Sequence, residues 1–186
     1  MTAQVNHRRL IEKGRIFDIT TENVTLSNGY TVDLEIIRHP GASAIVPITE
    51  KDEVLMLKQY RHAVGGYIWE IPAGTFDGSE DPLVCAKREL TEETGYQAAH
   101  WSFLSAIIPV PGYSDEQIHL FLARDLKPAK QNLDQDEILE VHPIPIKRVL
   151  TMISNGEIND AKTITGILLA VTNPASALPD HLLMKS

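Results

Sequence analysis

The sequence contains very little cysteine: Cys85 is the single thiol in a chain of 186 residues. One cysteine excludes an internal disulfide and suits a protein of the reducing cytoplasm. Long hydrophobic runs are missing as well, since the longest candidate, ITGILLAV at 164–171, is far shorter than the roughly 18 residues that span a bilayer. The N-terminal segment MTAQVNHRRL has no apolar run behind its basic residues, so it lacks the pattern of a signal peptide. We therefore expect a cytoplasmic protein without a membrane span.

Positive charge is also scarce. The chain has 17 Lys and Arg against 25 Asp and Glu, which gives a formal net charge of -8 at pH 7. This balance argues against nucleic acid and anionic membranes as partners. The seven histidines are scattered without metal-ligand spacing, and there is no GxSxG nucleophile motif. A composition of 43% hydrophobic and 23% charged residues is that of a soluble globular protein with one main domain.

The pattern along the chain predicts a small N-terminal β unit at 1–40 and a larger α/β domain at 41–186. In the N-terminal unit, Asn28-Gly29 lies between strand-like segments and is a strong hairpin signal, and Pro40-Gly41 marks a break. In the larger domain, apolar and alternating segments predict strands, which are ASAIVPI, EVLMLKQY, GYIWEIPAG, HWSFLSAIIPV, EQIHLFLAR and EILEVHPI. Helices are expected after GYIWEIPAG and near IKRVLTMISNG and DAKTITGILLAV. This order favours an α/β sandwich.

The first of these helices crowds acidic residues together in the segment RELTEETGY. Asp81-Pro82 is a helix start signal and Gly95 is a stop signal. At about 100° per residue, Glu89 and Glu93 share one face and lie beside the mostly apolar stripe of the helix. The members of that stripe are Leu83, Ala86, Leu90 and Thr94.

This placement of Glu89 and Glu93 is unfavourable without a ligand. Like charges four residues apart cost a few tenths of a kcal/mol, and acids in the last turn face the negative end of the helix dipole. The alternative is a plain solvated acidic face, but that does not explain why the acids lie against the apolar stripe. A hard divalent cation such as Mg²⁺ would reverse both penalties, because it takes carboxylate and phosphate oxygens as ligands.

The same segment carries a family motif. GTFDGSEDPLVCAKRELTEETGY, from Gly74 to Tyr96, resembles the Nudix box: Gly, five residues, Glu, seven residues, Arg-Glu-Leu, one residue, Glu-Glu, one residue, Gly and an apolar residue. Tyr96 departs mildly from the pattern, where an aliphatic residue is commoner. The resemblance implies a Nudix hydrolase, which cleaves a nucleoside diphosphate linked to another moiety. It also implies the Nudix fold, an α/β/α sandwich with a mixed sheet.

The resemblance implies roles for the acids of the box. Glu89 and Glu93 would be the principal metal ligands together with the backbone carbonyl of Ala73, and Glu92 would serve a further metal or its water shell. Mg²⁺ is the expected metal, with Mn²⁺ as the alternative. Arg88 would orient the box by ion pairing, as would Glu80; the alternative for Arg88 is an ordinary surface charge pair.

A general base is expected from the acidic loop QNLDQDE at 131–137. By resemblance to ADP-ribose pyrophosphatases, Glu137 is the first candidate, as base or as a metal ligand that completes the site. Asp136 and Asp134 are close alternatives, and a merely solvated loop is another. A carboxylate near a metal has a depressed pKa, so it is ionised and can accept a proton at neutral pH.

Flanking segments extend the resemblance to the ADP-ribose pyrophosphatase subfamily over about residues 14–170. KQYRHAVGGYIWEIPAG and PVPGYSDE are similar to its motifs, and Pro111 matches its proline beyond the box. Arg61 matches an arginine near the phosphates or adenine, and a guanidinium suits phosphate. Glu116 matches an acid near the terminal ribose. Glu70 is a weaker substrate-binding candidate, because it can instead be the structural partner of an arginine.

The resemblance therefore implies metal-dependent hydrolysis of ADP-ribose, or of a related nucleoside diphosphate sugar, to AMP and ribose 5-phosphate. It also implies a homodimer with exchanged N-terminal strands. Phe17 and Tyr30 are available to stack on adenine, although Phe17 can be core and Tyr30 part of the hairpin. The alternatives are a GDP-mannose-type hydrolase and a non-catalytic sensor that binds ADP-ribose; the intact box and the lack of a fused DNA-binding module favour the enzyme.

Overall fold

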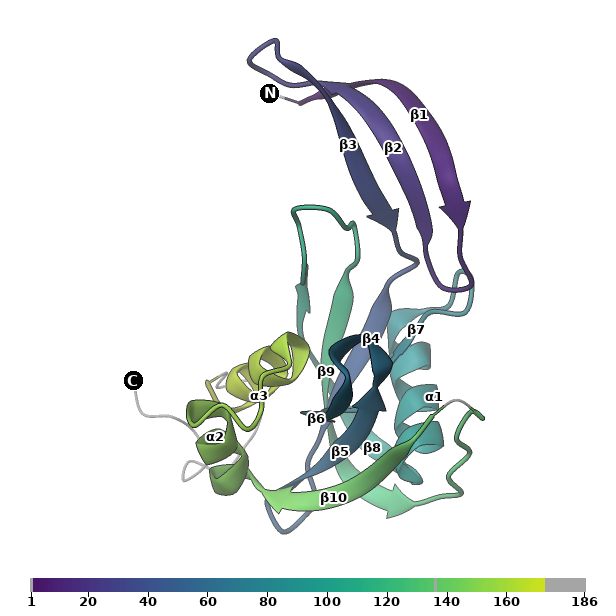
Figure 1. The fold of residues 1–186 in the computed structure, drawn as a ribbon. Helices are drawn as coiled ribbons and strands as arrows, with labels where there is room; N and C mark the ends of the chain where they lie inside the picture. The colour runs from purple at the N-terminus through teal and green to yellow at the C-terminus, as the bar shows by residue number, and fades with distance from the viewer. Residues whose placement is uncertain (1, 136, 173–186) are drawn as a thin grey trace. The chain divides into compact units, whose positions relative to one another are not determined.

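The protein is described by a computed structural model, which covers residues 2–135 and 137–172. Its chain separates into two compact units (Figure 1). The first unit contains Met1–Gly41 and Ile108–Gln117, and the second contains Ala42–Ile107 and Ile118–Ser186. Among the described residues, no helix is long and apolar enough to cross a bilayer.

The first unit contains an antiparallel sheet of three strands, β1 (Gln4–Lys13), β2 (Asp18–Thr25) and β3 (Thr31–Arg38). β2 and β3 form the predicted hairpin. The left-handed conformation of Gly29, with φ 83°, and a hydrogen bond from Tyr30 N to Asn28 Oδ1 close the turn. β1 was not predicted, because all of its residues are exposed and no face shows an apolar alternation.

Within the described residues, the second unit combines the remaining strands with three α-helices. Its strands are β4 (Ala42–Pro47), β5 (Glu53–Arg61), β6 (Gly66–Glu70), β7 (Ala73–Thr75), β8 (Tyr96–Ile107), β9 (Ile118–Pro128) and β10 (Leu139–Pro145). Its helices are α1 (Pro82–Thr94), α2 (Ile146–Ser154) and α3 (Ala161–Thr172), with a 3₁₀ turn at His62–Val64. The predicted mixed α/β class is confirmed.

The strands of this unit form two sheets. The mixed sheet has the order β7-β4-β9-β8, in which β4 and β9 run parallel and the other pairs are antiparallel. The second sheet has the order β10-β5-β6 and is antiparallel. As Figure 1 shows, α1 lies on one side of these strands and α2 and α3 on the other.

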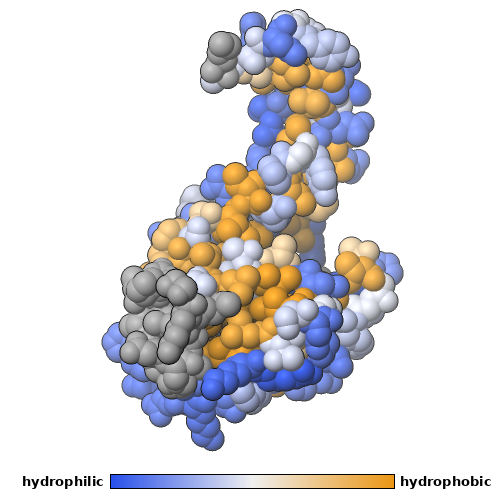
Figure 2. Space-filling model, turned by 90° about the vertical axis from the view of Figure 1, so that its left-hand side faces the viewer, coloured by the Kyte–Doolittle hydropathy of each residue, from blue (hydrophilic) through white to orange (hydrophobic). Residues whose placement is uncertain are grey.

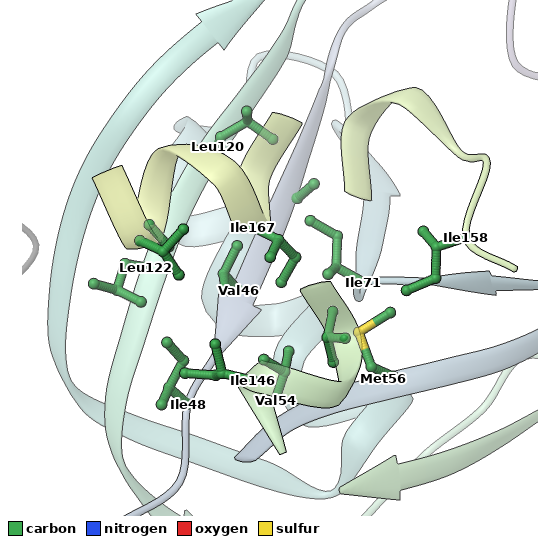
Figure 3. Packing of buried hydrophobic residues seen from close by; sticks show 14 of the residues in the cluster. Val46, Ile48, Val54, Met56, Ile71, Leu120, Leu122, Ile146, Ile158 and Ile167 are labelled. Atoms are coloured by element: carbon green, nitrogen blue, oxygen red, sulfur yellow. The ribbon is translucent and has the colours of Figure 1, made fainter. Parts of the chain in front are cut away.

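Strand β4 is buried on both faces, because helices cover each side of the mixed sheet. On one side Val46 packs in the larger hydrophobic cluster with Ile167 of α3 and Ile146 of α2 (Figure 3). On the other side Ile45 packs in a smaller cluster with Leu90 of α1. This explains why ASAIVPI is a continuous apolar run rather than an alternating one.

Helix α1 begins and ends where the sequence predicts. The side chain of Asp81 accepts hydrogen bonds from the backbone N–H groups of Leu83 and Val84, at 2.9 and 3.3 Å. At the other end Gly95 is left-handed, with φ 72°. The helix buries the predicted apolar face together with the two acids beside it, and its buried residues are Cys85, Ala86, Glu89, Leu90, Glu93 and Thr94.

Candidate active site

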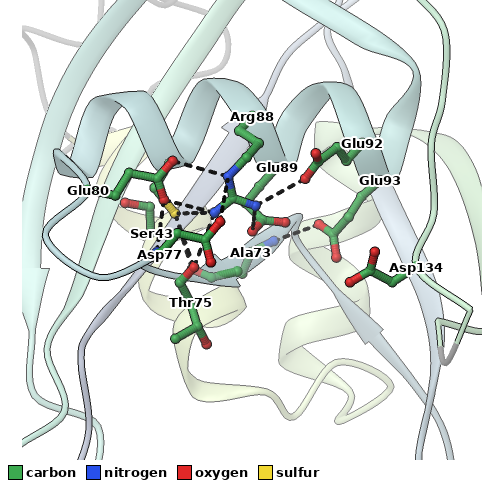
Figure 4. A network of polar contacts seen from close by, with 12 residues as sticks. Ser43, Ala73, Thr75, Asp77, Glu80, Arg88, Glu89, Glu92, Glu93 and Asp134 are labelled. Atoms are coloured by element: carbon green, nitrogen blue, oxygen red, sulfur yellow. Dashed lines mark hydrogen bonds and ion pairs between the residues drawn. The ribbon is translucent and has the colours of Figure 1, made fainter. Parts of the chain in front are cut away.

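The acids of α1 are placed as their spacing predicts. Glu93 is 1% exposed and Glu89 is 7% exposed, so both carboxylates lie at the edge of the core. The side chain of Glu92 is 35% exposed and so lies further from the core. The helix therefore presents two buried carboxylates in one direction, with a third acid close by (Figure 4).

Arg88 connects these acids to the loop that precedes α1. Its Nη1 donates to Glu89 Oε1 at 2.5 Å and to Glu92 Oε2 at 3.0 Å. Its Nε and Nη2 form a two-pronged contact with the carboxylate of Glu80, at 3.1 and 2.9 Å, and Nη2 also reaches the carbonyl of Thr75 at 3.2 Å. Arg88 thus fixes the loop on the helix and holds the carboxylates in place (Figure 4).

Strand β7 lies directly against the buried acids. The backbone N–H of Ala73 donates to Glu93 Oε2 at 2.8 Å. A Cβ added to Gly74 would overlap the carboxylate of Glu89, which explains why the box begins with glycine at this position. The carbonyl of Ala73 therefore belongs to a backbone segment that is held beside both carboxylates.

Burial shifts the ionisation of these acids strongly. Desolvation raises the pKa of Glu89 to about 7, even though Arg88 opposes the shift. Desolvation, reinforced by the charge of Glu89, raises the pKa of Glu93 well above its usual range. Two neighbouring carboxylates with raised pKa values indicate a site with an excess of negative charge, which a cation would stabilise.

The acidic loop follows β9 in the chain and contacts the end of α1. The side-chain amide of Gln131 donates to the carbonyl of Glu93 at 2.5 Å, and the backbone N–H of Asn132 donates to the carbonyl of Glu92 at 3.0 Å. These contacts satisfy carbonyl groups in the last turn of the helix. Such groups need outside partners, because no further helical turn supplies N–H donors to them. The loop is thereby attached to the helical residues that carry the acids.

The described acids of this loop lie near the box. The carboxylate of Glu137 accepts a hydrogen bond from the backbone N–H of Asp134 at 2.9 Å. The negative charge of Glu137 raises the pKa values of both Glu89 and Glu93, so it acts on the same site. Figure 4 shows the side chain of Asp134 pointing toward that of Glu93. The third candidate, Asp136, lies outside the described residues.

Arg61 and Glu70 form an ion pair beside this site. Arg61 donates from Nε and Nη2 to the two carboxylate oxygens of Glu70, at 2.8 and 2.9 Å. Glu70 is 1% exposed, and Lys162 of α3 donates to it at 2.5 Å. These contacts outweigh burial and lower the pKa of Glu70. An arginine partner for Glu70 is among the predictions from the sequence, whereas the contact with Lys162 is not.

The remaining predicted substrate-binding residues belong to the first unit. Pro111 and Glu116 lie in its segment Ile108–Gln117, and Glu116 Oε1 is 3.9 Å from His39 Nδ1. Phe17 and Tyr30 are both exposed there, so neither is a core residue. Their contributions to substrate binding remain predictions.

The residues around Glu89 and Glu93 fit a divalent cation, although the residues the structure describes contain no preformed group of three or more His, Cys, Asp or Glu that would hold one. The donor set is oxygen from carboxylates and a backbone carbonyl, which hard cations prefer. Burial, reinforced by neighbouring carboxylates, raises the pKa values of both acids, and the missing side chain of Gly74 leaves space for the carboxylate of Glu89. Glu89, Glu93 and the carbonyl of Ala73 are the groups that would hold the ion.

Cys85 is not suited to nucleophilic chemistry. It is fully buried on α1, and its thiol lies 3.4 Å from the carbonyl of Gly74. Burial raises the pKa of Cys85 to about 12, so it stays a thiol at neutral pH. The predicted packing role agrees with this environment.

Comparisons with known proteins agree with this geometry. Residues 37–165 match the family described as NUDIX domain. The ADP-ribose pyrophosphatase of Bacillus subtilis (strain 168) is 39% identical over 155 residues, covering 82% of this chain and 84% of the relative. The methanol dehydrogenase activator of Bacillus methanolicus is 39% identical over 160 residues, covering 84% and 86%.

A solved structure has the same fold. It is described as the crystal structure of ADP compounds hydrolase, with a TM-score of 0.80, 23% sequence identity, and coverage of 91% of this chain and 92% of that chain. The family match spans the mixed sheet, α1 with its acids and the acidic loop. The chain therefore belongs to the Nudix family of hydrolases.

Proposed function

We propose that the protein hydrolyses the pyrophosphate bond of ADP-ribose, or of a related nucleoside diphosphate sugar, to AMP and ribose 5-phosphate with the help of a divalent cation. The observation that carries this proposal is the pair of buried carboxylates, Glu89 and Glu93, on one face of α1. Burying two like charges together costs stability, so their presence points to a bound cation. The relative named ADP-ribose pyrophosphatase supports the substrate.

Glu89, Glu93 and the carbonyl of Ala73 would hold the cation, with Glu92 as a further oxygen ligand. For Glu137, completing this ligand set is the alternative to acting as the base. Mg²⁺ is the metal we propose, with Mn²⁺ as a possible substitute, because the donor set is oxygen throughout. When bound, the ion would neutralise the phosphate oxygens and activate water. Arg88 contributes by keeping Glu89 and Glu92 in position, since it donates to both.

The hydrolysis needs a base that takes a proton from the attacking water. In our proposal this base is Glu137, whose charge acts on Glu89 and Glu93 and which precedes the first residue of β10, Leu139, by two positions. The water oxygen forms a bond to phosphorus, the bridging P–O bond breaks, and the proton passes to the carboxylate. Asp134 is the alternative base among the described acids of the loop.

Arg61 is the proposed contact for the diphosphate group. Its side chain is 41% exposed although Glu70 occupies two of its nitrogens, so a ligand can reach it. A guanidinium held in this way presents a fixed edge to an anion. Pro111 and Glu116 are proposed to bind the remainder of the substrate.

We further propose that the first unit contributes to a homodimer and to substrate binding. Its sheet exposes several large hydrophobic side chains, and Figure 2 shows hydrophobic residues along it. A small sheet with such a surface gains stability from a partner surface. The exposed residues are Val5, Leu10, Ile11 and Leu34 on the strands and Ile16, Phe17 and Tyr30 in the turns between them. The single cysteine of the chain supports a cytoplasmic location.

A substrate panel tests the proposal. The purified protein would be incubated with ADP-ribose, GDP-mannose, ADP-glucose and NADH, with and without Mg²⁺, and the products separated by chromatography. We expect ADP-ribose to yield AMP and ribose 5-phosphate only when Mg²⁺ is present. Faster cleavage of GDP-mannose than of ADP-ribose would agree with the proposed mechanism but would show that GDP-mannose is the preferred substrate. Binding of ADP-ribose without cleavage of any compound would favour the sensor and overturn the enzyme.

A further inference from the structure

Glu70 has cations on two sides. Arg61 of β5 contacts both of its carboxylate oxygens, and Lys162 of α3 donates to one of them, Oε2. Lys162 lies 92 positions further along the chain, so this contact joins the helix to the end of β6. A carboxylate that is 1% exposed and bonded on both sides has one well-defined orientation.

The first turn of α3 holds Lys162 in turn. Asp160 Oδ2 accepts hydrogen bonds from Lys162 Nζ at 3.1 Å, from the backbone N–H of Thr163 at 2.9 Å and from its hydroxyl at 2.6 Å. The hydroxyl oxygen of Thr163 also accepts the backbone N–H of Ile71 at 2.9 Å. The first turn of α3 therefore forms hydrogen bonds both to the side chain of Glu70 and to the backbone of the next residue, Ile71.

These contacts determine the direction of Arg61. Its Nε and Nη2 are engaged on Glu70, and the guanidinium group is planar, so the position of Glu70 sets where the Nη1 edge points. That edge belongs to a partly exposed side chain, whose pKa is raised by Glu70 and, to a smaller degree, by the charge of Glu93. Arg61 thus lies within the electrostatic field of the buried acids of α1.

We propose that Lys162 is a positioning residue for the substrate site: by fixing the carboxylate of Glu70, it holds the guanidinium group of Arg61 in the orientation that receives the diphosphate. This inference rests on the proposed function, in which Arg61 contacts the substrate. Lys162 itself is bonded to Glu70 and Asp160 and acts through Arg61.

Steady-state kinetics with ADP-ribose and saturating Mg²⁺ test this assignment in the full-length protein. We expect Lys162→Met to raise KM about tenfold and to leave kcat within about twofold, because ground-state binding is what Arg61 supplies. Lys162→Arg, which keeps a cation at this position, should restore KM to within about threefold of the wild-type value. Arg148→Met removes an exposed ion pair between Arg148 of α2 and Glu157, and it should leave both constants unchanged.

A double-mutant cycle separates positioning from a merely structural effect. If Lys162 acts through Arg61, adding Lys162→Met to Arg61→Met should raise KM no further. An equal rise of KM in both backgrounds would overturn the inference, as would an unchanged KM in Lys162→Met. If Lys162→Met does not fold, Lys162→Gln replaces it and must have a higher KM than Lys162→Arg; equal values would overturn the inference.

The failure of the proposed function would look different. A wild-type protein that shows no Mg²⁺-dependent cleavage overturns the proposed function and, with it, the role of Arg61. Cleavage by the wild-type protein together with a normal KM in Lys162→Met overturns the inference about Lys162 alone.

Discussion

At the scale of single residues, Glu93 combines deep burial with a poorly compensated carboxylate. It is 1% exposed, lies near Glu89 and accepts one backbone N–H from Ala73. That single hydrogen bond does not compensate for the loss of water around an ionised carboxylate, and the raised pKa of Glu93 reflects the deficit. Such a residue lowers the stability of the metal-free fold, and its proposed role as a cation ligand accounts for its presence.

Replacing Glu93 by Gln should separate these two roles. We expect the rate of ADP-ribose hydrolysis to fall about 10²–10³-fold, since an amide is a poor ligand for a hard cation. The fold should remain, because Gln keeps the shape and can still accept the N–H of Ala73. Circular dichroism and rate, measured on the same sample, check both expectations. Near-normal turnover in a folded variant would contradict the assignment of Glu93 as a ligand.

Gln59 has a buried amide oxygen whose removal should stabilise the protein. Its side chain is buried on β5, 4% exposed, and its amide oxygen has no hydrogen-bond partner among the described residues. An unpaired buried polar atom costs about 1–3 kcal/mol. We therefore expect Gln59→Met to raise the melting temperature. Gln97→Met, the same change at an exposed position of β8, should leave it unchanged. A lower melting temperature for Gln59→Met would show that the amide has a stabilising partner.

At the scale of elements, the site is built where α1 meets β7 and the acidic loop. The helix presents the acids, β7 supplies backbone groups beside them, and the loop donates hydrogen bonds to carbonyl groups in the last turn of the helix. The orientation of Glu89 and Glu93 therefore depends on where α1 starts and stops.

Removing the N-cap of α1 tests this dependence. Asp81 satisfies the backbone N–H groups of Leu83 and Val84 at the first turn. Asp81→Ala should lower the free energy of unfolding by about 1 kcal/mol, within a usual range of about 0.5–2 kcal/mol. Urea denaturation followed by circular dichroism measures this change. Asp81→Asn is the matched control, because Asn caps helices about as well as Asp. Equal losses in both variants would contradict a capping role.

Sequence reasoning was most successful for elements with strong local signals. The bounds of α1 follow from its caps, and the burial of Glu89 follows from its position beside the apolar stripe. β1 was missed because it has no buried face, and β7 because three residues carry no period. The link from Glu70 to Lys162 depends on tertiary packing, so no local pattern predicts it. Asp160 with Thr163 at a helix start was a detectable capping signal.

At the scale of the whole molecule, the buried acids make stability depend on pH. The pKa of Glu89 is raised from 4.5 to about 7 by burial, and burial also raises the pKa of Glu93 well above its usual range. The folded protein therefore binds more protons than the unfolded chain above about pH 4.5. The contribution of these groups to stability is fully present below that pH and is lost as the pH rises through about 7 and beyond.

Urea midpoints at pH 5 and pH 8 in the presence of a chelator measure this effect. We expect the metal-free wild-type protein to lose more stability between these values than Glu93→Gln, which has one fewer group to ionise. Adding Mg²⁺ at pH 8 should restore stability in the wild-type protein, because a ligand that binds the folded state stabilises it. The same pH dependence in both proteins would contradict the raised pKa of Glu93.

The measurement that tests the central claim most directly is ADP-ribose hydrolysis in ¹⁸O-labelled water, with and without Mg²⁺, followed by mass spectrometry of the products. The account predicts that AMP and ribose 5-phosphate form when Mg²⁺ is present, and that one ¹⁸O atom enters the phosphate group of one of them, because water attacks phosphorus. Cleavage that needs no metal, or products whose phosphates carry no label, would contradict it.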